Sequence, residues 1–396
     1  NPNDYSDTII RDLTISGGEI DLGDSSEGFA MCGAGVDIYN ASPTFENVKI
    51  SGNAMYGGAD FMTGGAGMCI WGNNATPILY NMTIAFNHLQ SDIAGGAGLF
   101  VAEGAQIYIE NSEIVDNTIE ATFFGGGGGI LCWADDNSLF YKNVIARNSV
   151  SSFLGYSGAG GILINLSDPL FINTTVTKNT LYRFGFEAFG AGGGVHSEGY
   201  SNPIFINSII YDNGLDIYLG WTEDNEEIIE SFGTDLLNFS NPGNLTIDYS
   251  DIGLLDENNL QSLNYVNNMS IAISENSQIN YGNHNMNVDP NFVNAEEEIY
   301  SLDYSSDCID TGTSNFQWNN QTIDFEDYDW NYSGTSPDMG AIESFLGDMN
   351  NDLVINVVDI VIIVSLILNM EYNVIGDINE DGNLNVNDIV IIIPFI

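Results

Sequence analysis

Apolar residues alternate with other residues at a period of two in short stretches that recur through the first half of the chain. Such alternation is typical of strands, because successive side chains of a strand point to opposite faces of a sheet. One face would carry Val36 and Ile38, Met68 and Ile70, Leu99 and Val101, Ile130 and Cys132, and Ile162 and Ile164. The opposite face would carry Asp37, Cys69, Phe100, Leu131 and Leu163. Each unit continues with a second strand-like stretch, such as PTFENVKI or PLFINTTV, and no unit contains an amphipathic stretch of helical length.

These strands belong to an internal repeat of about 32 residues. In every unit an apolar residue closes a cluster of glycines, in steps of 32, 31, 31, 32 and 33 residues, at Val36, Met68, Leu99, Ile130, Ile162 and Val195. An asparagine follows each cluster, in steps of 34, 30, 31, 31 and 34 residues, at Asn53, Asn87, Asn117, Asn148, Asn179 and Asn213. Equivalent strands of successive units would then pair in parallel and wind the chain into a solenoid. Glycines would supply the positive-φ corners, and the asparagine amides would stack along the coil.

The order of these motifs resembles that of the right-handed parallel β-helix repeat proteins of bacterial surfaces, of the pectate-lyase-like and polymorphic outer-membrane types. The glycine cluster with its apolar residue and the stretch SPTFENVKISGN carry this resemblance in the repeats. The stretches YSLDYSSDCIDTG and SPDMGAIE resemble the final turns and cap of such proteins. The expected fold is all-β: a right-handed parallel β-helix over residues 1–345, with repeats at about 9–235 and a cap at about 236–345.

Two segments near the C-terminus place oxygen-bearing side chains at the positions of a calcium loop. Positions one, three, five, nine and twelve of the second segment are Asp377, Asn379, Asp381, Asn385 and Asp388. The same positions of the first segment are Asp348, Asn350, Asp352, Asn356 and Asp359. Gly382 stands at the sharp turn of the second loop, whereas Leu353 replaces this glycine in the first. We therefore expect the first loop to bind calcium more weakly.

This pair of loops resembles a type I dockerin, in which each calcium loop is followed by a helix. The resemblance implies a Ca2+-binding tail over residues 346–396 that docks on a cohesin of a scaffold or cell surface. A plainer alternative stays open, in which the loops only stabilise a small domain. A regular helix after the second loop is disfavoured, because that segment is rich in β-branched residues and is interrupted by Pro394.

Acidic side chains outnumber basic ones by 55 to 6, which gives a formal net charge of −49. This charge argues against nucleic acid and an anionic membrane surface as partners, because a phosphate backbone is bound through clustered Lys and Arg. It makes cations the natural counterparts, and it also keeps a protein soluble in salty surroundings. The apolar runs at residues 357–368 and 389–396 are too short to span a membrane.

The chain begins at Asn1 without Met, which predicts a processed product whose secretion signal has been removed. Together with the resemblance, this places the protein outside a bacterial cell or on its surface. The four cysteines, Cys32, Cys69, Cys132 and Cys308, show neither a CxxC pair nor a zinc spacing, so we expect small buried hydrophobes. A Cys32–Cys69 disulfide stays open as an alternative.

Catalysis by a lyase would have to draw on very few bases, because the chain has only six basic residues. Alignment of the repeats on the asparagine gives one column of successive turns, occupied by Gly52, Phe86, Asp116, Arg147, Lys178 and Asp212. Its opposite charges would form either a sugar-cleaving groove or a salt-bridge ladder on an outer face, and the ladder is favoured. Asp135, Asp136 and Asp168 are expected to form turns rather than a hydrolase pair. The three histidines, His88, His196 and His284, are scattered and lack the spacing of a metal or triad site. No catalytic residue is therefore assigned.

Aromatic residues gather between the asparagine corner and the next glycine cluster, on one edge of successive turns. They are Tyr56, Phe61, Phe123, Phe124, Phe153, Tyr156, Tyr182, Phe184, Phe186 and Phe189. Their stripe would stack on sugars, contact another copy of the protein, or pack the loops onto the coil as a hydrophobic seam.

The sequence favours a secreted, non-catalytic β-helix protein of a cell surface or extracellular matrix, with a structural or adhesive role. Its calcium-binding tail would anchor or assemble it. Open strand edges at the ends of the coil would let copies associate end to end, and a contact that does not close would build filaments. The candidate partners are a second copy, a cohesin-like scaffold and a polysaccharide. The alternative function is that of a dockerin-bearing polysaccharide lyase or glycoside hydrolase.

Overall fold

The structure is a computed structural model of the whole chain. It describes residues 8–22, 32–57, 62–135, 137–184, 189–191, 193–213, 215–221, 227–233, 236–238, 244–253, 271–273, 278–318, 321–328, 330–350, 354–379 and 381–395.

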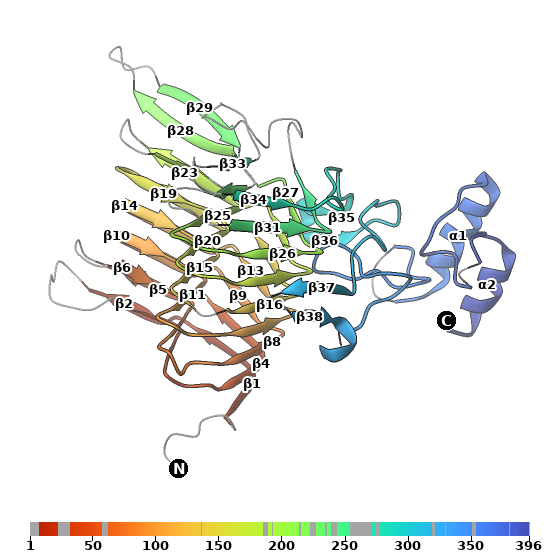
Figure 1. Cartoon of the computed structure of the whole chain (residues 1–396), viewed down its shortest axis with the longest axis horizontal. Coiled ribbons are helices and arrows are strands. Elements are labelled where there is room, and N and C mark those ends of the chain that lie inside the picture. The colour runs from red at the N-terminus through yellow and green to blue at the C-terminus, as the bar shows by residue number, and fades with distance from the viewer. Residues whose placement is uncertain are drawn as a thin grey trace.

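The chain winds into a parallel β-solenoid of about six turns, as the repeat predicts (Figure 1). Equivalent strands of neighbouring turns pair with each other, and this pairing builds three long sheets. Sheet I holds the strands that follow the six glycine clusters: β3 (Val36–Tyr39), β7 (Met68–Trp71), β11 (Leu99–Ala102), β15 (Ile130–Trp133), β20 (Ile162–Asn165) and β25 (Val195–Glu198). Two later strands extend it: β30 (Leu236–Asn238) and β33 (Ile271–Ile273).

Sheets II and III complete each turn. Sheet II consists of β1 (Ile9–Ser16), β4 (Thr44–Ser51), β8 (Ile78–Tyr80), β9 (Thr83–Ala85), β12 (Tyr108–Glu110), β13 (Glu113–Val115), β16 (Leu139–Tyr141), β17 (Val144–Ala146), β21 (Leu170–Ile172), β22 (Thr175–Thr177), β26 (Ile204–Ile206), β27 (Ile209–Tyr211), β31 (Asn244–Asp248), β32 (Asp251–Ile252) and β34 (Gln278–Tyr281). Sheet III consists of β2 (Glu19–Asp21), β5 (Ala54–Tyr56), β6 (Met62–Gly64), β10 (His88–Gly95), β14 (Thr118–Gly126), β18 (Ser149–Ser152), β19 (Tyr156–Gly158), β23 (Thr180–Phe184), β24 (Phe189–Ala191), β28 (Leu215–Trp221) and β29 (Glu227–Gly233).

The sequence predicted two strands in each turn, and the structure differs in two respects. First, the second predicted strand is divided in most turns by a residue with positive φ, such as Asn81, Asn111 or Asn173. Second, sheet III was missed. Its turns each bury one large apolar residue among Ser, Ala and Gly, which leaves little alternation to recognise: Met55, Leu89, Ile119, Val150 and Leu181.

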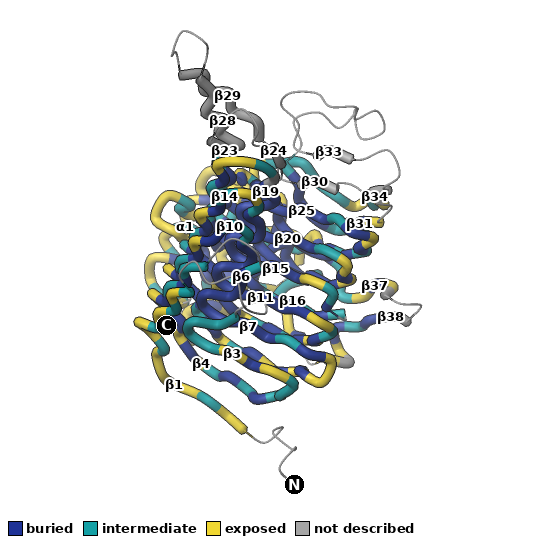
Figure 2. The backbone as a smooth tube through the Cα atoms, turned by 90° about the vertical axis from the view of Figure 1, so that its left-hand side faces the viewer, coloured by how far each residue is buried: buried dark blue, intermediate teal, exposed yellow. Residues whose placement is uncertain are grey.

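The core of the coil follows the predicted alternation. Inward side chains of sheets I and II form one continuous apolar cluster, and buried residues line the inside of the coil (Figure 2). Phe140, Phe171 and Phe205 stack in consecutive turns, with ring centroids 4.5 Å apart in each pair. Residues of sheet I that point the other way form a separate buried cluster: Cys69, Phe100, Leu131 and Leu163.

Asparagines hold the corner between sheets II and III, and glycine clusters form the corner between sheets III and I. The asparagine side chains form a continuous buried ladder, in which each Nδ2 donates to the Oδ1 of the next turn over 2.8–3.0 Å: Asn53, Asn87, Asn117, Asn148, Asn179 and Asn213. A Cβ on Gly67 would lie 2.7 Å from Nδ2 of Asn87, so this glycine leaves room for the ladder. Gly65, two residues earlier, has φ +63° and turns the chain. The predicted stacking of the asparagine amides is confirmed, and the predicted positive φ is found at Gly33, Gly65, Gly96 and Gly127, whereas Ala159 adopts it in the fifth turn.

Two pieces of the C-terminal part cover the outer face of sheet II, and both lie on one side of the coil (Figure 1). The first consists of β35 (Phe292–Asn294), η2 (Ala295–Glu297) and β36 (Ile299–Leu302), and its Tyr300 packs against Val115 and Ala146. The second consists of β37 (Asn315–Trp318), β38 (Gln321–Asp324) and η3 (Phe325–Tyr328), and it packs on Tyr141. Parallel pairing continues past residue 235 through β30, β31 and β34, so the coil extends into the region predicted as its cap.

The chain ends in two helices, α1 (Val357–Asn369) and α2 (Val386–Ile392), with η4 (Ile393–Phe395) after the second. They project on the side that carries β35–β38 (Figure 1). The expectation that no regular helix follows the second loop was wrong. Asn385 and Asp388 form a capping box at its start, and Pro394 falls in η4, beyond the last α-helical residue. Among the described residues, no helix is long and apolar enough to cross a membrane.

Candidate functional site

The C-terminal loop-and-helix pair, residues 346–395, is built as a duplication. The five loop positions of the second half lie 29 residues after those of the first, as 377 − 348 = 29 shows for the first ligand position. In both halves the last loop residue caps the helix that follows: Asp359 accepts from the backbone N–H of Asn356, and Asp388 accepts from that of Asn385. The local sequence therefore ties each loop to the start of its helix.

The second loop wraps around two buried carboxylates. Asp377 accepts hydrogen bonds from the backbone N–H of Gly382 at 2.8 Å and from the Tyr372 hydroxyl at 3.1 Å. Asp388 accepts from Asn385 at 2.8 Å and, more distantly, from Asn379 at 3.4 Å. Gly382 has φ +77°, which confirms the sharp turn at the sixth loop position.

The first loop repeats part of this arrangement. Asp359 accepts hydrogen bonds from the backbone N–H groups of Met349 at 2.8 Å, Asn350 at 3.3 Å and Asn356 at 2.7 Å. Asp352 and Leu353 lie outside the described residues, so the comparison of the sixth positions stays a prediction.

The electrostatics of this pair of loops are unusual for a small apolar unit. Asp348, Asp359, Asp377 and Asp388 are each at most 2% exposed. The six basic residues of the chain end at Arg183, so the tail contains no Lys or Arg. Burying an ionised carboxylate is costly unless a positive charge accompanies it. Carboxylate and amide oxygens are the ligands of hard divalent cations, so the residue types present here fit such an ion.

Each helix also presents a stripe of apolar side chains to solvent. On α1 the exposed residues follow the spacing i, i+4, i+7, i+11: Val357, Val361, Val364 and Leu368. In the second half the equivalent residues are Val386 and Val390 of α2 and Ile393, which begins η4. The opposite faces pack inward through Ile363, Leu366 and Ile392. The sequence analysis missed these stripes, because the helical segments are apolar on nearly all sides and show no contrast between faces.

The charged column forms the predicted ladder, with the C-terminal part of the chain added to it. Arg147 binds both carboxylate oxygens of Asp116, at 2.9 and 2.7 Å, and also approaches Glu298 at 3.2 Å. Its third partner is the Tyr300 hydroxyl at 2.8 Å. Burial alone would lower the pKa of Arg147, but the hydrogen bonds with Asp116 and Tyr300 outweigh it and raise that pKa. Arg147 is therefore held as a cation.

Lys178 is held in the same way. Its Nζ lies 2.6 Å from Asp212 and 3.2 Å from Glu296. The hydrogen bond to Asp212 is the main cause of a raised Lys178 pKa. Neither basic residue of the column is poised to remove a proton, because a general base must be unprotonated near neutral pH.

The aromatic residues of the loop edge are divided between solvent and packed positions. Phe123 and Phe153 are exposed, whereas Phe124 packs against the outer cluster of sheet I and Tyr56 is half-buried beside His88. Tyr182 is half-buried as well. The remaining predicted positions have no described side chain: Phe61, Tyr156, Phe184, Phe186 and Phe189.

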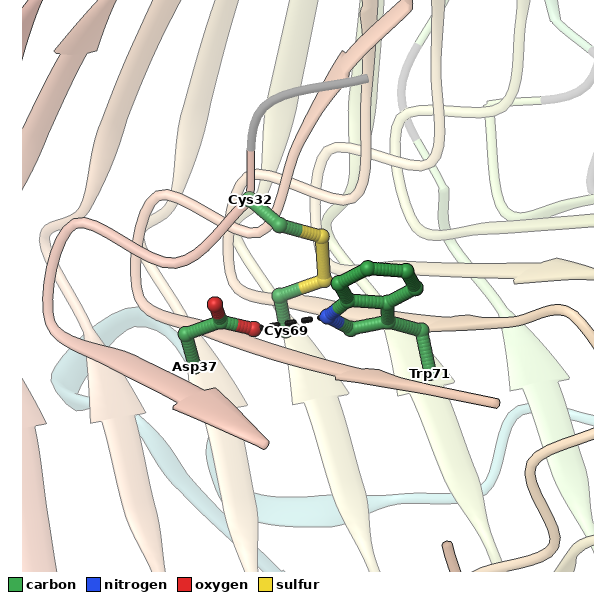
Figure 3. Close-up of a disulfide and its surroundings, with 4 residues drawn as sticks. All are labelled: Cys32, Asp37, Cys69 and Trp71. Atoms are coloured by element: carbon green, nitrogen blue, oxygen red, sulfur yellow. Dashed lines mark hydrogen bonds between the residues drawn. A yellow bond between two sulfur atoms is a disulfide. The ribbon is translucent and has the colours of Figure 1, made fainter. Parts of the chain in front are cut away.

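A disulfide joins Cys32 to Cys69 of β7, with Cα atoms 5.5 Å apart, and Trp71 lies beside it (Figure 3). Cys132 and Cys308 are free and buried, as expected. The two bonded cysteines lie close to Asp37, and the possible ligand atoms of these three residues are within 4.8 Å of one another. Among the described residues, no other three Cys, His, Asp or Glu side chains come this close together. Because both sulfurs are used in the disulfide, this group is not a metal site. The acidic side chains of the second loop that the structure describes, Asp377, Asp381 and Asp388, are more widely spaced than this.

Comparison with known proteins gives no match: no protein-family model, curated protein or solved structure is significantly similar to the chain.

Proposed function

We propose that the protein is a non-catalytic solenoid that is held on an extracellular scaffold or cell surface through its C-terminal loop-and-helix pair. The observation that carries this proposal is the pair of exposed apolar stripes on α1 and α2. Large exposed apolar patches on soluble proteins mark interaction sites. These patches belong to a chain with a net charge of −49, whose largest apolar cluster lies inside the coil. The resemblance to a dockerin makes a cohesin-like domain the preferred partner.

Calcium orders the docking surface in this proposal. It would supply the positive charge that the residues of the tail lack, and it would be bound by Asp377, Asn379, Asp381, Asn385 and Asp388, with the equivalent residues of the first loop. Asp359 and Asp388 each belong to a loop and also cap a helix that carries a stripe. Loosening a loop would therefore loosen the start of its helix.

A structural or adhesive role for the coil is supported by the state of the charged column. Arg147 and Lys178 are each held by two acidic partners, one in the column and one in the η2–β36 segment. That segment lies against the part of the column in which a cleaving groove would need its bases, Arg147 and Lys178. The Cys32–Cys69 disulfide supports an extracellular location, because disulfides persist in oxidising compartments.

The proposal is tested by binding of the full chain to a panel of purified type I cohesin domains, in millimolar calcium and in chelator. We expect binding in calcium, loss of binding in chelator, and loss of binding in the double variant Val361→Glu/Val390→Glu. Phe123→Glu is the control, because Phe123 is an exposed apolar residue of the coil.

Sedimentation of the same proteins distinguishes docking from self-association. If the stripes join copies of this chain, the wild type forms assemblies in calcium that the double variant does not. A wild-type protein that binds no cohesin domain and stays monomeric in calcium contradicts the proposed role of the tail.

A further inference from the structure

One row of side chains runs along the outer face of sheet I, at the last position of its strands. The parallel register aligns Tyr39, Trp71, Ala102 and Trp133 in four successive turns, which we call the aromatic row. Asn165 and Glu198 continue it in the next two turns. Tyr39 is 56% exposed and Trp133 is 36% exposed, so the row faces solvent over several turns.

The neighbouring outward positions of sheet I are not available to a ligand. Phe100, Leu131 and Leu163 are buried beneath the glycine corners that enter the sheet. Side chains crowd these corners, since a Cβ on Gly64 would collide with Phe100 and one on Gly126 would collide with Leu163. The side chains of the aromatic row are therefore the exposed part of this face, and they lie beside tightly packed apolar residues.

The rings of the row are held in place. The Trp71 indole N–H donates to the Asp37 carboxylate at 2.8 Å (Figure 3). The ring of Tyr39 lies against that of Trp71, with centroids 4.1 Å apart. Ala102 is only 5% exposed, because the larger side chains of the row lie on both sides of it. A surface with few rotamers to freeze binds at a low entropic cost.

The charges around the row select the kind of ligand. No strand of sheet I contains a Lys or Arg, whereas Asp37 and Glu198 lie on its outer face. An anionic polymer would meet only like charge here. Asp37, Asn165 and Glu198 are instead suited to hydrogen bonds with hydroxyl groups.

We propose that the aromatic row binds a neutral polysaccharide that lies along the axis of the coil. Trp71 and Trp133 are two strands apart, which corresponds to about 9.6 Å at the spacing of parallel strands. This distance is close to the length of a disaccharide unit in an extended glycan. Two sugar rings of one chain would stack on the two indoles, and the unit between them would pass over the small side chain of Ala102. The site does not depend on the proposed docking of the tail.

The test is native affinity electrophoresis of the full chain through gels that contain hydroxyethylcellulose, xyloglucan or galactomannan, with polygalacturonate as the anionic counterpart. We expect retardation by at least one neutral polymer and none by polygalacturonate. Trp71→Ala and Trp133→Ala should each weaken binding about twofold to tenfold. Alanine suits the backbone at this position, since Ala102 occupies it in the intervening turn. The control is Phe123→Ala, which removes an exposed ring outside the row.

Three outcomes overturn the proposal: no retardation of the wild type by any of the neutral polymers, equal retardation of wild type and Trp133→Ala, or stronger retardation by polygalacturonate. A change in the sedimentation of the wild type that Trp71→Ala or Trp133→Ala abolishes would assign the row to contact between copies instead. The tail variant Val361→Glu/Val390→Glu should keep its glycan binding, so failure of this proposal is distinguishable from failure of the docking proposal.

Discussion

The coil and the C-terminal loop-and-helix pair bury polar side chains in different ways. In the coil, the side-chain amides of Asn87, Asn117 and Asn148 form hydrogen bonds with one another, and those of Asn117 and Asn148 also donate to backbone carbonyl groups. These neutral side chains are therefore satisfied by neutral partners. In the tail, the carboxylates of Asp377 and Asp388 accept backbone hydrogen bonds but have no basic residue in the same unit. The buried amides of the coil are thus satisfied within the chain, and we propose that a bound cation balances the buried carboxylates of the tail.

The largest expected effect is on the coil. Asn117→Ala removes a buried amide that accepts from Asn87 and donates to Asn148 and to the carbonyl of Ile84. Several buried partners lose a hydrogen bond at once, so we expect the free energy of unfolding to fall by about 3 kcal/mol. Denaturant unfolding measures this change. Asn111→Gly is the control: Asn111 belongs to an exposed ladder, has φ +50° and should cost far less.

An effect of similar size is expected on the tail, through the ion. Asp381→Ala removes an exposed predicted ligand and leaves the bonds of Asp377 to Gly382 and of Asp388 to Asn385 in place. At a calcium concentration about a hundred times the dissociation constant, binding stabilises a folded unit by about 2.7 kcal/mol, and the variant should lose most of this. Calorimetric titration of calcium measures it. Identical stoichiometry and affinity in wild type and variant would remove Asp381 from the ligand set.

A smaller effect concerns the junction of coil and cap. Burial is the main cause that raises the pKa of Glu343 to about 8 and that of Asp338 to about 6, and their mutual repulsion adds to the shift of Glu343. A carboxyl whose pKa is raised by folding favours the folded state when protonated. Its contribution is fully present below the unfolded pKa and is lost as the pH rises through about 6 and then about 8. The protein should therefore melt at a lower temperature at pH 9 than at pH 5.

Glu343→Gln is the matched variant for this pH dependence, since it keeps the side-chain shape and removes the titration. It should flatten the change in melting temperature between pH 6 and pH 9 that the wild type shows. An unchanged pH profile in the variant would show that Glu343 does not titrate as proposed.

The smallest effect is expected at the rim of the column. Lys178→Ala breaks contacts with Asp212 and Glu296, whose side chains are exposed, so the free energy of unfolding should fall by no more than about 1 kcal/mol. Added salt should reduce the difference between variant and wild type. A loss several times larger would mean that the ladder holds the cap on the coil.

Sequence reasoning succeeded where a local pattern repeats. The glycine clusters and the asparagines at 53, 87 and 117 predict the coil, because every turn needs the same backbone geometry and hydrogen bonds at its corners. The ladder between Asp116 and Arg147 was predictable for the same reason. The contacts of Arg147 with Glu298 and Tyr300 were not, since they join segments about 150 residues apart that share no repeat.

The two surfaces that carry the proposals left weaker signals. Tyr39, Trp71 and Trp133 each stand three residues after the apolar residue that closes a glycine cluster, so the aromatic row is present in the aligned repeats. Ala102 interrupts it, and the interruption hides the row from a search for continuous stripes. The stripe on α1 was hidden by its apolar neighbours, and only the packing of Ile363 and Leu366 separates the inner face from the outer one.

The proposal that the tail, unlike the coil, needs calcium is tested most directly by hydrogen exchange of the full chain, followed by mass spectrometry, in millimolar calcium and in excess chelator. We expect peptides of α1 and α2 to lose protection in chelator, whereas peptides of sheet I and of the asparagine ladder should exchange equally slowly in both conditions. Equal protection of α1 and α2 with and without calcium would contradict it.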